Sequence, residues 1–92
     1  MIKTLRHRGL RRLYEKADPS QVRPDLVQRI EDILAHLDQA AKLSDLNLPG
    51  YRLHQLKGDR AGTWSISVSG NWRVTFRFQQ GDVYDVSLED YH

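Results

Sequence analysis

The sequence contains no cysteine, few prolines and no long apolar run, and these absences exclude several classes of protein. Without cysteine, the 92 residues can form neither a disulfide nor a thiolate metal site, and no thiol is available as a nucleophile. No apolar run is long enough to cross a membrane, and the first residues lack the apolar segment of a secretory signal. We therefore expect one soluble domain, spanning residues 1–92, in the cytoplasm.

Several catalytic and nucleotide-binding motifs are also missing. Neither G-x-x-x-x-G-K nor G-x-G-x-x-G occurs, so the chain has no glycine-rich phosphate loop. No serine lies in a G-x-S-x-G elbow, and the chain is too short for the hydrolase fold that carries that elbow. The chemistry must therefore come from side chains of another kind.

The charges are unevenly placed, although their sum is only +2. Residues 1–16 carry six Lys or Arg against one Glu, and residues 50–81 carry five against one Asp. Residues 17–49 and 82–92 are acidic. Basic clusters on a small domain indicate a polyanionic partner, whereas the simpler interpretation is a solvated polar face.

Two helices are predicted in the first half of the chain. Leu10, Leu13, Tyr14 and Ala17 have the spacing of one helical face, and Asp18-Pro19-Ser20 ends that helix. A second helix of about sixteen to eighteen residues starts at Pro24 and continues to about position 41. Its apolar positions give the strongest periodic signal in the sequence: Leu26, Ile30, Ile33, Leu34, Leu37 and Ala41.

Strands dominate the second half of the chain. We expect them at 51–57, at 63–69, from Trp72 to Phe78 after a Gly70-Asn71 hairpin turn, and from Asp82, with a further short strand at 2–6. Strict alternation in the last strand places Tyr84, Val86 and Leu88 in the core. Helices followed by strands predict an α+β fold, in which two N-terminal helices pack on one face of a small, mostly antiparallel sheet. Arg73 and Arg77 then lie on the opposite face, which is open to a ligand.

A few side chains in this half of the chain can support three kinds of site. The residues in question are His54, Lys57, Arg73, Asp90, Tyr91 and His92. Imidazoles with cations can cleave RNA without a metal, because they supply a base, an acid and charge stabilisation. His54, Asp90 and His92 can alternatively ligate a metal, which the nearby cations disfavour. The remaining interpretation is that these side chains only pack at the edge of the sheet.

Short motifs spread over essentially the whole chain point to one family. They are Leu48-Pro49-Gly50, 53–58 (Leu-His-Gln-Leu-Lys-Gly), Trp64-Ser65-Ile66, Gly70-Asn71-Trp72-Arg73 and the terminal Asp90-Tyr91-His92. In this combination and order the chain resembles the HigB toxins of bacterial toxin–antitoxin systems, within the RelE/ParE superfamily.

The resemblance implies a RelE-like fold and a ribosome-dependent endoribonuclease that cuts mRNA in the ribosomal A site without metal or cofactor. It implies a HigA-like helix-turn-helix antitoxin as partner, through which alone the toxin meets operator DNA, and no membrane. It assigns the active site to His54, Asp90, Tyr91 and His92, with Lys57 and Arg73 at the phosphate. We expect the RNA and ribosome contacts at Arg6, Arg8, Arg11, Arg12, Lys16 and Arg77. The alternative within the superfamily is a ParE-like toxin that inhibits DNA gyrase without cutting RNA.

Overall fold

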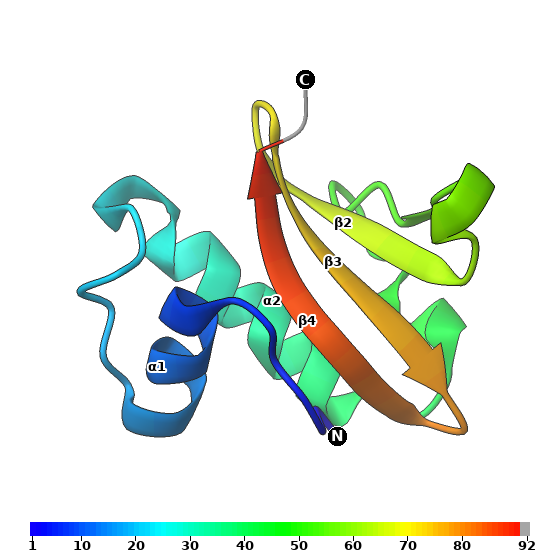
Figure 1. The fold of residues 1–92 in the computed structure, drawn as a ribbon, viewed down its shortest axis with the longest axis horizontal. Helices are drawn as coiled ribbons and strands as arrows, with labels where there is room; N and C mark the ends of the chain where they lie inside the picture. The colour runs from blue at the N-terminus through cyan, green and yellow to red at the C-terminus, as the bar shows by residue number, and fades with distance from the viewer. Residues whose placement is uncertain (91–92) are drawn as a thin grey trace.

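The computed structural model describes residues 1–90, and the two last residues, Tyr91 and His92, lie outside the described part. Two helices precede a four-stranded sheet (Figure 1). The elements are α1 (Arg8–Lys16), η1 (Pro24–Leu26), α2 (Val27–Gln39), η2 (Leu43–Leu46), β1 (His54–Gln55), η3 (Gly58–Arg60), β2 (Thr63–Ser69), β3 (Trp72–Gln79) and β4 (Asp82–Asp90). This arrangement confirms the predicted α+β fold.

The helices begin and end where the local chemistry requires. His7 caps α1, because its Nδ1 accepts a hydrogen bond from the Leu10 backbone N–H at 3.2 Å. Ala17 ends the helix in the left-handed region, with φ of 52°. The predicted second helix starts at Pro24 as expected, but its first turn is the 3-10 helix η1, and α2 follows it.

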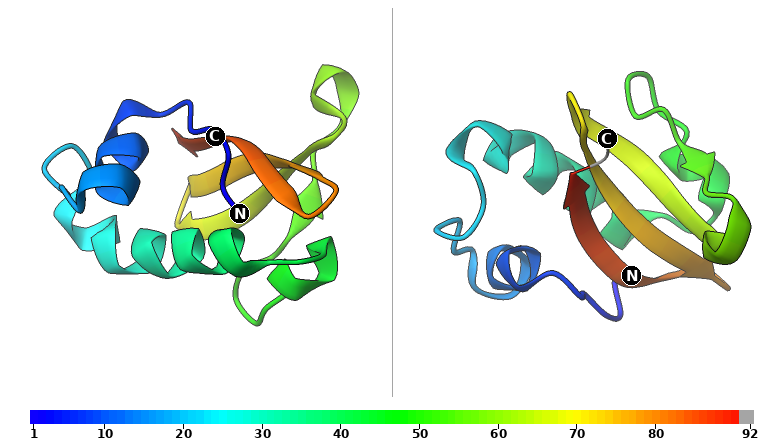
Figure 2. Two further views of the ribbon diagram at one scale, coloured as in Figure 1. Left: turned by 90° about the horizontal axis from the view of Figure 1, so that it is seen from below. Right: turned by 45° about the horizontal axis from the view of Figure 1, so that its top comes forward.

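The sheet is antiparallel throughout and its strands follow chain order, β1-β2-β3-β4. The α2 helix runs along one face of the sheet, and α1 packs beside it at the β4 side (Figure 2). Side chains from the helices and from one face of the strands form a single core. Its fully enclosed members include Leu10, Ile30, Ile33, Leu37, Leu46, Ile66, Val74, Phe76, Val83 and Val86.

Two predicted strands are shorter in the structure than the sequence indicated. The first, at 2–6, is reduced to two isolated parallel bridges to β4, Ile2 with Val83 and Leu5 with Val86. The strand predicted at 51–57 contains only the two residues of β1. Arg52 has a φ of 49°, so the chain cannot be extended immediately before β1, and Gly58 starts η3 shortly after it.

A β-bulge in β4 makes the predicted alternation of that strand wrong at Tyr84. Asp85 adopts a φ of 56°, and the register with β3 shifts between Thr75 and Arg77. Val86 is buried as predicted, but Val83 rather than Tyr84 is the next core residue of the strand. Tyr84 pairs with Arg77 and therefore lies on the other face of the sheet.

Candidate active site on the open face of the sheet

The register of the four strands builds a polar surface on the face that the helices leave open. Cross-strand partners share a face, so one row of side chains runs from His54 through Ser65 and Thr75 to Ser87. A second row, two residues along each strand, contains Ser67, Arg73 and Glu89. The period-two alternation that buries Ile66 and Val74 therefore also collects the polar and charged groups on one side.

A pocket of about 770 Å³ lies on this open face. Its walls come from the segment that leads into α1 and from η3, and its floor comes from β2, β3 and β4. Four arginines line it, Arg6, Arg8, Arg60 and Arg77, and the acidic members are Asp59, Asp85 and Glu89. Three of the predicted RNA-binding residues, Arg6, Arg8 and Arg77, are thus brought together by the fold although they come from distant parts of the sequence.

A second pocket, of about 360 Å³, contains three of the predicted catalytic residues. His54, Lys57 and Arg73 line it together with Arg60. Because Arg60 lines both pockets, they meet at its side chain. An extended anion that fills both pockets would pass from the N-terminal arginines to His54.

The His54 ring is held from two sides while its side chain stays exposed. Its Nδ1 lies 3.1 Å from the Arg52 carbonyl oxygen, and the Ser65 hydroxyl lies 3.3 Å from Nδ1 and 3.4 Å from Nε2. When Nδ1 carries the proton and donates a hydrogen bond to the Arg52 carbonyl oxygen, Nε2 keeps its lone pair and can accept a proton from a ligand. The geometry therefore suits general base catalysis, and the protonated ring suits general acid catalysis.

Glu89 and Arg60 form a two-pronged ion pair on the open face, and sequence reasoning missed both. Arg60 Nη1 donates to Glu89 Oε1 at 2.8 Å and Nη2 donates to Oε2 at 2.5 Å, while the Thr75 hydroxyl donates to Oε2 at 3.0 Å. Hydrogen bonding from Arg60, then from Thr75, lowers the pKa of Glu89 to about 2. The alternation in β4 could have identified Glu89 from the sequence, because it places Glu89, and not Asp90, on the same face of the sheet as Arg73.

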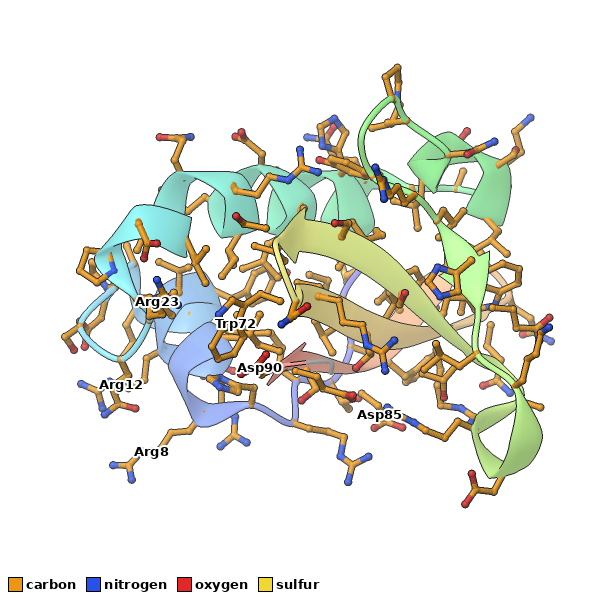
Figure 3. All side chains as sticks on the ribbon, turned by 90° about the horizontal axis from the view of Figure 1, so that it is seen from above. Arg8, Arg12, Arg23, Trp72, Asp85 and Asp90 are labelled. Atoms are coloured by element: carbon orange, nitrogen blue, oxygen red, sulfur yellow. The ribbon has the colours of Figure 1, made fainter. Side chains whose placement is uncertain are left out.

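Asp90 lies on the other face of the sheet from His54, Lys57 and Arg73. It pairs with Trp72 and lines a pocket with Arg23 and Asp25 near the start of α2 (Figure 3). The predicted grouping of Asp90 with the three other side chains is therefore not seen in residues 1–90. The physical reason is the period of the strand, which turns consecutive residues to opposite sides. The other two residues of that prediction, Tyr91 and His92, lie outside the described residues.

The predicted cations on α1 differ in their exposure and in their ion pairing, which the sequence did not indicate. Arg11 and Lys16 are exposed, but Arg12 makes an ion pair with Asp18, in which Nη2 and Oδ2 are 2.8 Å apart. Arg8 projects from the start of α1 toward solvent (Figure 3). An anion would bind less strongly to Arg12 than to a free arginine, because the ion pair with Asp18 would have to break first.

A metal site is not formed by the described residues. Within residues 1–90 no three His, Asp or Glu side chains are placed to hold one ion. Likewise, no helix in that part of the chain is long and apolar enough to span a membrane.

Solved structures of toxins have the same fold as this chain. YafQ from E. coli, in a mutant form, superposes with a TM-score of 0.65 at 14% identity, covering 98% of this chain and 91% of that chain. The YoeB–YefM complex from Staphylococcus aureus superposes with a TM-score of 0.61 at 15% identity, covering 100% and 95%. The fold is that of RelE-like toxins.

The sequence comparisons then give the family. The chain belongs to the HigB-like toxins, the RelE-like toxins of the type II toxin–antitoxin system HigB, whose family model matches residues 3–92. A relative from Proteus vulgaris, Endoribonuclease HigB, is 50% identical over 92 residues, which is 100% of both chains. The resemblance inferred from the sequence motifs is confirmed.

Proposed function

We propose that this chain is the endoribonuclease toxin of a type II toxin–antitoxin system and that it cuts mRNA in the A site of the ribosome. The observation that carries the proposal is the full-length, 50% identity to Endoribonuclease HigB from Proteus vulgaris. The pocket that unites His54 with Lys57 and Arg73 supports it, because an imidazole beside two cations is what RNA cleavage needs.

The reaction that we propose is attack of a ribose 2′-oxygen on the adjacent phosphorus. A base takes the proton of the 2′-hydroxyl, the new O2′–P bond forms as the P–O5′ bond breaks, and an acid protonates the leaving 5′-oxygen. His54 and His92 share the base and acid roles. Lys57 and Arg73 stabilise the charge that develops on the phosphoryl oxygens.

Two further residues of the predicted site stay in the proposal. Asp90 orients or polarises an imidazole, which is not that of His54 because the two residues lie on opposite faces of the sheet, or itself takes the proton. Tyr91 positions a nucleotide by stacking or hydrogen bonding. In this proposal no metal and no cofactor takes part. The toxin acts in the cytoplasm and is neutralised by a HigA-like helix-turn-helix antitoxin.

Three arginines of the larger pocket, Arg6, Arg8 and Arg77, and the cations of α1 bind the ribosomal RNA and mRNA backbones. Neutralising Arg6 and Arg8 together, each to Gln, should weaken ribosome binding and reduce the slope of log affinity against log salt by about two. Binding is measured by fluorescence titration of labelled protein at several salt concentrations. Lys42→Gln is the control, since Lys42 is exposed and lines neither pocket. An unchanged slope in the double variant would remove these arginines from the interface.

The test of the proposed function is induction of the chain in cells, followed by mapping of new mRNA 5′ ends. Cuts within translated codons, absent after induction of His54→Ala, are the expected result. Growth arrest with supercoiling defects and with intact transcripts would instead identify a gyrase inhibitor. Arrest with neither effect would refute both functions.

A further inference from the structure

Glu89 lies on the open face, near the end of the outermost strand β4. It is half-buried and is the direct cross-strand partner of Arg73 on β3. Arg60, which contacts it, reaches in from η3 and lines both pockets. Glu89 therefore lies between two cations, Arg60 where the pockets meet and Arg73 in the smaller pocket.

Each oxygen of the Glu89 carboxylate has two neighbours. Oε1 accepts from Arg60 at 2.8 Å and lies 3.6 Å from Arg73 Nη2. Oε2 accepts from Arg60 at 2.5 Å and from the Thr75 hydroxyl at 3.0 Å. Thr75 is only 2% exposed, so its hydroxyl is a fixed point in the sheet. The carboxylate thus holds the guanidinium group of Arg60, which comes from η3, against the β3–β4 pair.

Glu89 also separates two like charges. The guanidinium groups of Arg60 and Arg73 both lie at Oε1, and without the intervening carboxylate they would repel each other. Arg73 has a side chain that is 13% exposed, so it has little room to move away. Without Glu89, the Arg60 side chain, which is 41% exposed, would turn into solvent and no longer line the two pockets.

We propose that Glu89 is a positioning residue that holds Arg60 and Arg73 as one paired cation for the RNA phosphate, and that Arg60 is a further RNA-binding residue of the site. This inference rests on the proposed nuclease function. Arginine presents two parallel N–H groups to a phosphate as it does to a carboxylate, so Arg60, whose side chain is 41% exposed, can offer its outer edge to RNA while Glu89 holds its inner edge beside Arg73. Glu89 does not touch the reacting atoms.

Positioning and simple electrostatics predict opposite effects for Glu89→Gln. The substitution keeps the size of the side chain and removes a negative charge, so electrostatics alone predicts tighter RNA binding and an unchanged or faster reaction. Positioning predicts a cleavage rate at saturating toxin about 10- to 100-fold lower, because misplaced cations stabilise the transition state poorly. The half-saturating concentration should stay within about threefold of the unmodified protein, since net positive charge is not lost.

The experiment is single-turnover cleavage of mRNA on purified ribosomes over a range of toxin concentrations. The unmodified chain, Glu89→Gln and the control Glu31→Gln are compared; Glu31 is exposed on α2 and lines neither pocket. The control should cleave within about twofold of the unmodified chain, because exposed charges contribute little. A variant that merely folds less well would raise the apparent half-saturating concentration and leave the rate at saturation unchanged.

A second comparison asks whether Glu89 acts through Arg73. In an Arg73→Ala background, Glu89→Gln should lower the rate by a clearly smaller factor than in the unmodified chain, because one of the two groups that it positions is gone. Equal factors in the two backgrounds would overturn the positioning role, as would a normal rate for Glu89→Gln. If the unmodified chain cuts no ribosome-bound mRNA, the proposed function itself is wrong, and that result is distinct from either of these.

Discussion

Replacing Glu89 with Gln should destabilise the protein at neutral pH and much less in acid. Folding lowers the pKa of Glu89 from its ordinary 4.5 to about 2, mainly through Arg60. Such a change corresponds to at most about 3 kcal/mol of folding free energy above pH 5. Solvent screening reduces it, since 41% of the Arg60 side chain and 27% of the Glu89 side chain are exposed, and we expect about 1–2 kcal/mol.

The sign of the pH dependence follows from the direction of the pKa change. A carboxyl whose pKa is depressed by folding stabilises the folded state fully above its unfolded pKa, and this stabilisation is lost as the pH falls toward the folded pKa. The difference in unfolding free energy between the unmodified chain and Glu89→Gln should therefore be largest at pH 7. It should fall by about half by pH 3 and approach zero near pH 2.

The assay is urea unfolding followed by tryptophan fluorescence at pH 7, 5 and 3, in low and in high salt. Comparing the two proteins at each pH cancels the contribution of other carboxyls, such as Asp18, whose pKa is also lowered to about 2. High salt should shrink the difference. Equal unfolding free energies at pH 7, or a difference that is the same at pH 7 and pH 3, would refute the reasoning.

Two further predictions concern the packing of the N-terminal segment. Gly9→Ala should lower the unfolding free energy by about 1–3 kcal/mol although alanine favours helices, because the new Cβ would lie 2.6 Å from the Gln21 carbonyl oxygen; a gain in thermal stability would contradict the close contact. Asp38 accepts from the Ile2 backbone N–H at 2.9 Å and from the Tyr14 hydroxyl at 2.7 Å. Asp38→Ala should therefore cost about 1–3 kcal/mol in urea unfolding and Tyr14→Phe clearly less, and equal costs would show that the bond to Ile2 contributes nothing.

Local patterns predicted the elements that carry strong periodicity. The apolar spacing from Leu26 to Leu37 gave the long helix, and the alternation on either side of Gly70-Asn71 gave the β2–β3 hairpin with its core and polar faces. The grouping of His54, Lys57 and Arg73 followed from short motifs and is seen in one pocket. These features depend on residues that are close in sequence or in adjacent strands.

The features that the sequence did not predict depend on backbone events and on distant contacts. Alternation cannot reveal that Asp85 adopts a positive φ, and this single residue moves Tyr84 from the core face to the open face. The ion pair between Arg60 and Glu89 joins residues 29 positions apart, so it requires the strand register to be known. The same register separates Asp90 from the side chains with which it was expected to group.

Cleavage of ribosome-bound mRNA by the purified chain, compared with His54→Ala, tests the central claim most directly. His54 is exposed, so its replacement should leave the unfolding free energy within about 0.5 kcal/mol of the unmodified value. We predict cuts by the unmodified chain at a rate about 100-fold or more above that of the variant. A rate for His54→Ala equal to that of the unmodified chain would contradict acid–base cleavage by this site.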